Sequence, residues 1–314
     1  MGKFLKGAAA VLGLLTVAEA GGTAYFYRRT MKRYNAKTER TIKMSGVDWE
    51  KYFPLMHKRH DWMMEQPHED VWISSHDGLR LHGTYFEGDG GDKAVICFHG
   101  YTSQGTNDYS SLSYYYLNHG FRVLLIDERA HGESEGTYIG FGTMDRLDGM
   151  EWIKWMIDKI GEDAQILLHG NSMGGATVCM MSGLDLPPQV KGIISDCAFT
   201  SMKDVFTHVL HSMYHIPAFP MLQLADWANK RQVGYGLDDC DSSREVKRAK
   251  VPFLFIHGKE DVFVPCWMTE KIYENCAAPK TKFIVEGAGH GESYYKDTEG
   301  YEKAMDSFLG GVIK

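Results

Sequence analysis

The stretch from Ile166 to Thr177, ILLHGNSMGGAT, constrains the fold more than any other part of the chain. It begins as a short apolar strand and ends as the start of a helix, with Gly170 and Gly174 on either side of Ser172. Glycine at these two positions allows a strand to reverse into a helix more tightly than other residues permit. The pattern G-x-S-x-G therefore predicts that Ser172 lies at the tip of the turn with its hydroxyl exposed, as a serine nucleophile does.

From residue 94 onward, short apolar segments alternate with longer helix-like segments. Strands are predicted at 94–98, 122–126, 165–168, 190–195, 252–256 and 282–285, and helices near 111–118, 144–160, 173–183, 267–275 and 301–312. This alternation predicts an α/β fold with a mainly parallel sheet and helices on both faces. An antiparallel hairpin is expected before it, with strands at 71–75 and 79–86. Sites in such sheets form at the carboxyl ends of the strands.

One segment, 201–250, interrupts the alternation after the sixth predicted strand. It has no strand pattern and is rich in methionine, histidine and aromatic residues, so we expect a small helical cap over the site. This composition suits ordinary packing and an apolar acyl pocket equally. His208, His211 and His215 would share one face of a helix, but solvent-facing histidines are the simpler interpretation, and no metal site is predicted.

Candidate partners for Ser172 follow two later strands. Asp261 lies in the polar loop HGKEDVFVP after the strand at 252–256, and His290 lies in the glycine-rich loop EGAGHG after the strand at 282–285. A serine hydroxyl is a weak nucleophile at neutral pH and needs a base, which in turn needs an orienting carboxylate. The chain order Ser172, Asp261, His290 is the order of a Ser-Asp-His triad on this kind of sheet.

Other residues of the right type compete for these two roles. Glu260 and Asp196 are the alternative acids, and His99 and His131 are the alternative bases. Both histidines fall in turns that follow strands, where an imidazole more often bonds the backbone than takes a proton from a substrate. Asp261 and His290 are therefore preferred.

A triad also needs fixed donors for the oxyanion that forms during attack on a carbonyl. The backbone N–H of Met173 is one candidate, because it starts the helix after the nucleophile, where N–H groups lack intrahelical acceptors. The backbone N–H of Tyr101 is the other, because Gly100 lets the loop after the strand at 94–98 approach closely. Tyr101 and Met173 are the predicted oxyanion-hole residues.

In combination these motifs resemble the α/β-hydrolase-fold serine hydrolases. The residues that carry the resemblance are His99-Gly100-Tyr101, Asp127 to Ser134, Gly170 to Gly174, His257-Gly258 with Asp261 and Val264-Pro265, and Gly289-His290. The chain is most similar to the membrane-anchored, esterase-like branch of Bem46-like and prolyl-oligopeptidase-type hydrolases. That resemblance implies hydrolysis of an ester, thioester or amide through an acyl-enzyme, on a small acyl or ester substrate that is lipid-like or peptide-like. It implies no metal and no organic cofactor.

Two other functions remain open at this point. A serine peptidase or amidase would use the same three residues, because a triad does not specify the leaving group. A membrane-bound interaction protein that kept the fold and lost the chemistry would be marked by a missing triad member. All three members are present in this sequence.

The N-terminal residues form a separate unit at 1–33. Residues 7–27 are an apolar run flanked by Lys3 and Lys6 before it and by four basic residues after it. A helix of this length can cross a bilayer, which predicts a membrane anchor. The small residues around Glu19 also fit a signal peptide, cleaved to release a secreted protein, and a buried helix is the third possibility. The basic C-terminal flank favours a cytoplasmic domain, but the side of the membrane stays open.

The remaining chain divides into a helical linker at 34–70 and a catalytic domain at 71–314. The formal net charge of −7 and the absence of a basic patch outside the N-terminal region disfavour a nucleic-acid partner. The six cysteines have no C-x-x-C spacing and are interpreted as buried free thiols.

Overall fold

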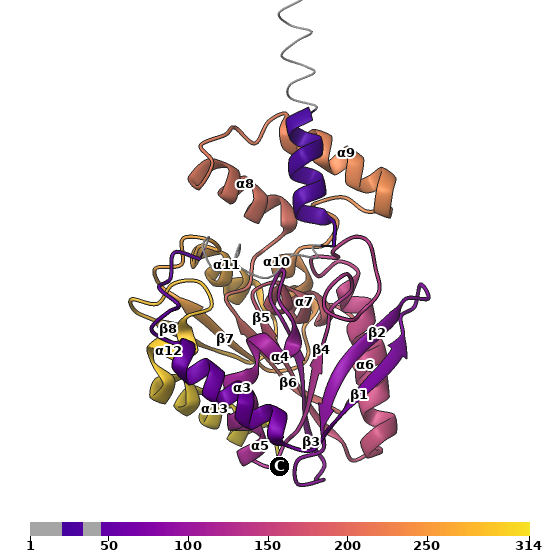
Figure 1. Cartoon of the computed structure of the whole chain (residues 1–314), viewed down its shortest axis with the longest axis vertical. Helices are drawn as coiled ribbons and strands as arrows, with labels where there is room; N and C mark the ends of the chain where they lie inside the picture. Colours follow the sequence, from indigo (N-terminus) through magenta and orange to yellow (C-terminus); the bar gives the residue numbers. More distant parts are fainter. Residues whose placement is uncertain (1–20, 34–44) are drawn as a thin grey trace, which may run out of the picture.

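An eight-stranded sheet forms the centre of the protein in a computed structural model that describes residues 21–33 and 45–314. The strands are β1 (His68–Ser74), β2 (Arg80–Phe86), β3 (Lys93–Phe98), β4 (Arg122–Ile126), β5 (Gln165–Asn171), β6 (Val190–Asp196), β7 (Phe253–Gly258) and β8 (Lys280–Val285). Their order across the sheet is β1-β2-β4-β3-β5-β6-β7-β8 (Figure 1). The pairs β1·β2 and β2·β4 are antiparallel and all other pairs are parallel. The predicted fold class is confirmed.

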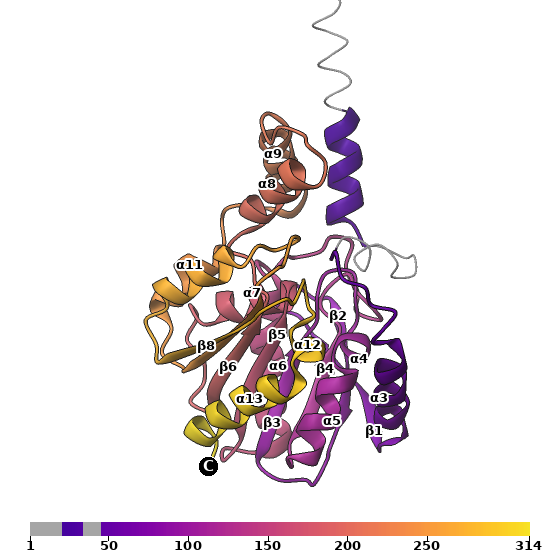
Figure 2. The ribbon, with the colours of Figure 1, turned by 90° about the vertical axis from the view of Figure 1, so that its left-hand side faces the viewer.

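Helices cover both faces of this sheet. One face carries α6 (Asp145–Ile160), α7 (Met173–Met181), α10 (Ser242–Glu245), a 3-10 turn η1 (Val246–Arg248) and α11 (Trp267–Asn275). The other carries α5 (Ser110–Asn118), α13 (Thr298–Val312) and, outside α5, α3 (Phe53–Glu65), with the short helices α4 (Gly105–Asp108) and α12 (Ser293–Lys296) in the connecting loops (Figure 2). Within β3, Ile96 faces the first layer and Cys97 the second, because successive side chains of a strand point to opposite faces. This double coverage explains the continuous apolar strands of the sequence.

The cap lies above the carboxyl ends of the strands. It consists of α8 (Met202–Ser212) and α9 (Met221–Val233), which follow β6 as expected. The segment after α9 returns to the body of the domain, where α10 packs against α7 and α11. The helical cap is therefore shorter than the predicted segment 201–250.

A helix at 21–31 stands beside α8 and α9 and ends on the catalytic domain (Figures 1 and 2). Tyr27 and Met31 are buried, and the Tyr27 hydroxyl donates a hydrogen bond to Oδ1 of Asn229 in α9 at 3.0 Å. Its end is held by a backbone bridge between Lys32 and Tyr138. Residues 7–20 of the predicted anchor lie outside the described residues. Among the helices that the structure describes, none is long and apolar enough to cross a bilayer.

The three histidines of the cap do not form one helical face, so that expectation was wrong. His208 and His211 lie on α8, whereas His215 follows the end of the helix with a φ of 54°. His208 hydrogen-bonds the carbonyl of Val262, and His211 accepts a hydrogen bond from the backbone of Ala218. All six cysteines are buried and unpaired with one another, as expected.

Candidate active site

Ser172 occupies a strained turn between β5 and α7. Its φ of 55° and ψ of −108° fall in a region that residues with a side chain rarely adopt. The turn closes so tightly that a Cβ built on Gly174 would overlap the carbonyl oxygen of Phe98, and one on Gly170 would overlap that of Gly174. The backbone N–H of Ser172 donates to the carbonyl of Asp196 at 2.8 Å, which ties the turn to β6. The glycines thus have the steric role that the sequence predicted.

The structure brings Ser172, His290 and Asp261 into one hydrogen-bonded chain. Oγ of Ser172 lies 2.8 Å from Nε2 of His290, and Nδ1 of His290 lies 2.6 Å from Oδ2 of Asp261. Because an ionised carboxylate can only accept, the proton of neutral His290 is on Nδ1, which leaves Nε2 to accept from the serine hydroxyl. All three side chains are almost completely buried, so Ser172 is not exposed on the surface as predicted but lines two cavities.

Asp261 is held from several sides. Its Oδ1 accepts from the backbone N–H groups of Phe263 and Val264 at 2.9 and 2.8 Å, and its Oδ2 lies 3.2 Å from Nε2 of His257 as well as near His290. Burial alone would raise the pKa of Asp261, but the two neighbouring imidazoles hold its pKa well below the usual range. The carboxylate therefore stays ionised, and it can stabilise a positive charge on His290.

The two predicted oxyanion donors lie beside the nucleophile. Met173 is the first residue of α7, and Tyr101 follows Gly100, whose built Cβ would lie 3.5 Å from Cβ of Ser172. The loop is fixed by Asp108, whose Oδ2 accepts from the backbone N–H of Gly100 at 2.6 Å and from Nδ2 of Asn171 at 3.2 Å. Asp108 has no local sequence signal for this role, because only the fold places α4 against this turn.

The competing histidines have other partners. Nε2 of His99 accepts from the backbone of Glu128 at 3.0 Å, and Nε2 of His131 accepts from the backbone of Thr102 at 3.1 Å. Burial and the neighbouring His99 lower the pKa of His131 to about 3, so it is neutral. Both imidazoles support the loops around the site and do not contact Ser172.

Neither competing acid contacts His290. Asp196, the last residue of β6, accepts a hydrogen bond from the Tyr301 hydroxyl at 3.1 Å, and Glu260 has an exposed side chain. Arg129 pairs with Asp148 at 2.7 Å and with Asp77, and so ties the loop after β4 to α6. The cluster that includes Asp77 and Asp148 has the spacing of metal ligands, but this guanidinium already supplies its positive charge.

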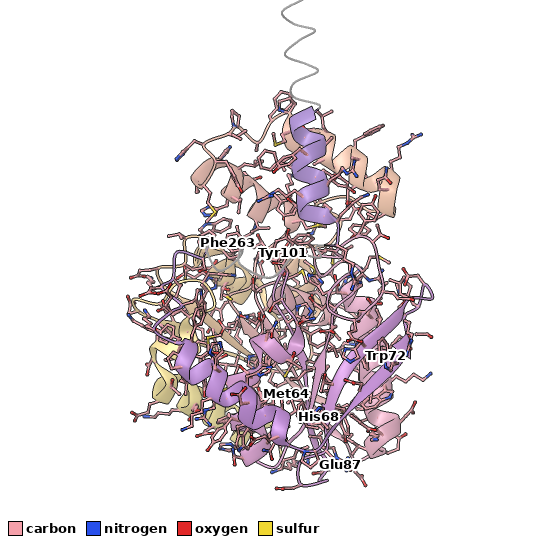
Figure 3. All side chains as sticks on the ribbon, viewed as in Figure 1. Met64, His68, Trp72, Glu87, Tyr101 and Phe263 are labelled. Atoms are coloured by element: carbon pink, nitrogen blue, oxygen red, sulfur yellow. The ribbon has the colours of Figure 1, made fainter. Side chains whose placement is uncertain are left out.

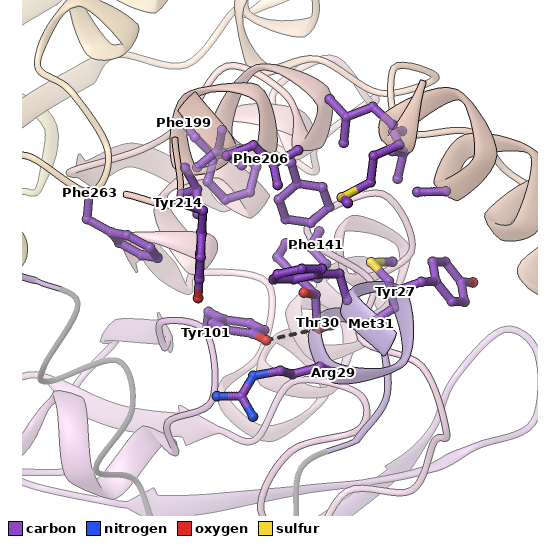
Figure 4. Close-up of a pocket in the computed structure, with 18 of the residues that line it drawn as sticks. Tyr27, Arg29, Thr30, Met31, Tyr101, Phe141, Phe199, Phe206, Tyr214 and Phe263 are labelled. Carbon is purple, nitrogen blue, oxygen red and sulfur yellow. Dashed lines mark hydrogen bonds between the residues drawn. The ribbon is translucent and has the colours of Figure 1, made fainter. Parts of the chain in front are cut away.

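An apolar cavity of about 130 Å³ opens on one side of Ser172. Its walls come from the cap, from the loops of the sheet and from the helix at 21–31, as Figure 4 shows for Tyr27, Met31, Phe141 and Phe206. The Tyr101 hydroxyl donates to the carbonyl oxygen of Thr30 at 3.0 Å and so joins that helix to the oxyanion loop. Tyr101 and Phe263 lie where the cap meets the body of the domain (Figure 3).

A second, larger cavity of about 390 Å³ is also lined by Ser172. Besides Ser172, its lining includes His290, Tyr295 and six residues between Ser45 and His60, which precede the sheet. Phe53, Met56, His57 and His60 all line it from α3. Their spacing of three, one and three residues is that of one helix face, so the sequence contained the signal for this wall. It did not contain the direction in which the face points.

Comparison with known proteins places the chain in a family. A family model for the alpha/beta hydrolase fold matches residues 93–229. The uncharacterized protein YqkD of Bacillus subtilis is 30% identical over 242 residues, which cover 76% of this chain and 78% of that protein. The chain belongs to the α/β-hydrolase family.

A further relative and a solved structure are also similar to this chain. The uncharacterized membrane protein YNL320W of Saccharomyces cerevisiae is 24% identical over 247 residues, which cover 77% of this chain and 80% of that protein. The solved structure of the Pyrococcus furiosus esterase Pf2001 has a TM-score of 0.66 and 22% identity, and the match covers 81% of this chain and 94% of that one. At this identity the structural likeness establishes the shared fold.

Proposed function

We propose that this α/β hydrolase is a serine hydrolase that cleaves a carboxylic ester through an acyl-enzyme. The observation that carries the proposal is the continuous chain from Oγ of Ser172 through both nitrogens of His290 to Oδ2 of Asp261. A positioned base and an orienting carboxylate are what an alcohol nucleophile requires at neutral pH. The apolar cavity beside Ser172 fits the hydrocarbon part of an acyl group.

The steps follow from the contacts. Nε2 of His290 takes the hydroxyl proton as Oγ of Ser172 attacks the carbonyl carbon, and the Tyr101 and Met173 N–H groups stabilise the oxyanion. The imidazolium then gives this proton to the leaving oxygen, and the carbon–oxygen bond breaks to form the acyl-enzyme. Water attacks the acyl-enzyme by the same route, with His290 as the base, and releases the acid. Asp261 stabilises the imidazolium in both halves.

We also infer that the protein belongs to a membrane-anchored, Bem46-like esterase branch. Three observations support an anchor: the apolar run at 7–27, the description of the yeast relative as a membrane protein, and the surface beside the helix at 21–31. On that surface Phe219 and Trp227 are 72% and 62% exposed, and Lys230 and Arg231 follow on α9. Exposed aromatic residues next to basic ones are typical of a membrane interface. Membrane fractionation of the full chain against a Leu14→Lys/Leu15→Lys variant tests this point, and a variant that fractionates like wild type contradicts it.

The test of the hydrolase is labelling with a fluorophosphonate, which reacts with activated serines. Wild type should be labelled, Ser172→Ala and His290→Ala should not, and Ser74→Ala, at an exposed serine on β1, should be labelled like wild type. Matched hexanoyl esters and amides then separate an esterase from an amidase. A folded wild-type protein that resists labelling would contradict the proposal and favour the interaction protein.

A further inference from the structure

The two cavities beside Ser172 share an unusual feature. Each takes part of its wall from the chain that precedes the sheet: the helix at 21–31 lines the smaller cavity, and six residues between Ser45 and His60 line the larger. Ser172 and Tyr101 line both. The two parts of a substrate whose carbonyl carbon is at Ser172 therefore have two spaces of different size available to them.

The position of His290 decides which part of the substrate enters which cavity. In the proposed mechanism the imidazolium must give its proton to the leaving oxygen, so the leaving group has to lie on the side of His290. Among the described residues, His290 lines the larger cavity and is not part of the wall of the smaller one. We propose that the smaller cavity binds the acyl group and the larger one binds a bulky leaving alcohol, and that the N-terminal segment selects both. This inference rests on the proposed function.

The size of the smaller cavity sets the acyl group. A cavity of about 150 Å³ holds one benzene molecule in another protein, so about 130 Å³ corresponds to an acyl chain of roughly six carbon atoms. Two hydrogen bonds hold the helix at 21–31 in place as its wall, from Tyr27 to Asn229 and from Tyr101 to Thr30. Phe26 lies in this wall and contacts Tyr214 of the cap edge to face, with ring centroids 5.4 Å apart.

The lining of the larger cavity suits an alcohol that has a flat part and a polar group at its end. Trp49, Phe53 and Tyr295 provide aromatic side chains, and the imidazoles of His57 and His60 provide hydrogen-bonding groups farther along α3. At about 390 Å³ it has three times the volume of the acyl cavity. The chemical class is an ester of a short apolar acid with a bulky alcohol that carries an aromatic or similarly flat part and hydrogen-bonding groups.

The wall of the larger cavity is fastened to the loop of the catalytic base. Oε1 of Glu292 accepts from Nζ of Lys51 at 2.9 Å and from the Tyr52 hydroxyl at 2.7 Å. Its Oε2 accepts from the backbone N–H of Gly289 at 2.8 Å, next to His290. One buried carboxylate thus holds the start of α3 at a fixed position relative to His290, as a leaving-group site requires.

Two phenylalanines give a matched test. Phe26 lines the acyl cavity and Phe53 the leaving-group cavity, and both are partly buried and precede the sheet. Each Phe→Ala variant is assayed on p-nitrophenyl esters of increasing acyl length and on hexanoyl esters of methanol, benzyl alcohol and 2-naphthylmethanol. Leu55→Ala, on α3 and outside both cavities, is the control for helix perturbation.

We expect each variant to change only one of the two substrate profiles. Phe26→Ala should lengthen the preferred acyl chain by about two carbon atoms. Each additional methylene that fits should raise kcat/KM about fourfold. The ratios of kcat/KM between esters of the different alcohols should stay unchanged. Phe53→Ala should lower kcat/KM for the naphthylmethyl ester about tenfold relative to the methyl ester and keep the preferred acyl length. Deacylation, followed by mass spectrometry of the acyl-enzyme, should be unchanged in Phe53→Ala because the leaving group has already departed.

The outcomes separate this inference from the proposed function. If wild type is labelled by the fluorophosphonate but the two variants change both profiles alike, or exchange their effects, the assignment of the cavities is overturned while the hydrolase stands. If wild type is folded and unlabelled, the proposed function fails first. Should Phe26→Ala not fold, Val209→Ala, in the same cavity, replaces it.

Discussion

Nε2 of His257 lies 3.2 Å from Oδ2 of Asp261, the same oxygen that accepts the hydrogen bond from Nδ1 of His290. Nε2 of His257 also lies 2.8 Å from the carbonyl oxygen of Val264. Because both oxygens can only accept, the proton of His257 must be on Nε2. His257 is completely buried and does not reach Ser172, so it acts as a positioning residue for the carboxylate.

His257→Phe should lower kcat/KM about 10- to 100-fold, because a hydrogen bond to a charged group contributes about 1.5–3 kcal/mol. His257→Gln, which can still donate to Asp261, should recover part of the loss. A pH profile of kcat/KM distinguishes this role from a purely structural one. Without the hydrogen bond from His257, the Asp261 carboxylate interacts differently with His290, so the low-pH side of the profile should change. Equal losses and unchanged profiles in both variants would contradict the prediction.

Asp108→Ala should lower kcat about 10- to 100-fold with little change in KM, because Asp108 holds the loop that carries Tyr101 and the oxyanion forms only during reaction. Asp108→Asn keeps an acceptor and should lose less. Steady-state kinetics on a p-nitrophenyl ester measure both. A rise in KM at constant kcat would instead place Asp108 in substrate binding.

Gly174→Ala should lower the free energy of unfolding by about 3 kcal/mol or more, because the new Cβ overlaps the backbone of Phe98. Gly310→Ala is the matched control. Nothing lies within 4 Å of a Cβ at Gly310, near the end of α13, so alanine should raise stability by about 0.5–1 kcal/mol. Urea unfolding measures both, and similar effects at the two sites would refute the steric account of the turn.

Asp196→Asn should raise the free energy of unfolding relative to wild type, and this difference should grow between pH 4 and pH 7. Burial raises the pKa of Asp196 to about 6, against an ordinary value of 3.8. As the pH rises between these values, the unfolded chain loses this proton while the folded one keeps it, so wild type loses up to about 3 kcal/mol. Asparagine does not titrate. Denaturant unfolding of both proteins at pH 4, 5, 6 and 7 should show the difference growing with pH, and a constant difference would show that the pKa is not raised.

The fold followed from the sequence because its signals are local. The apolar strand at 122–126 has its predicted bounds. The strand predicted at 165–168 begins as predicted and continues to Asn171 as β5. The predicted hairpin forms as β1 and β2, although β1 begins earlier, at His68. Its first residues are polar and lie at the sheet edge, so no apolar pattern marks them.

The sequence indicated which residues form the site better than it indicated how they are held in place. Ser172, Asp261 and His290 each follow a strand, and parallel strands bring their carboxyl ends to one edge. The roles of Asp108 and His257 were not predicted, although His257 belongs to one of the motifs that carry the resemblance, because an aspartate on a short helix and a histidine at the end of a strand have no local signal for what they contact. Their partners, Gly100 and Asp261, are known only once β3, β7 and their loops are placed side by side.

The sequence by itself determined the α/β class, the strained serine turn and the order of its partners, because glycine spacing and apolar periodicity act over a few residues. Only the tertiary structure decided what surrounds Ser172. The helix at 21–31 and α3 precede the catalytic domain in the chain, yet each lines a cavity beside the nucleophile. Such walls depend on packing between distant segments, and packing is set by the shape of the whole core rather than by any local pattern.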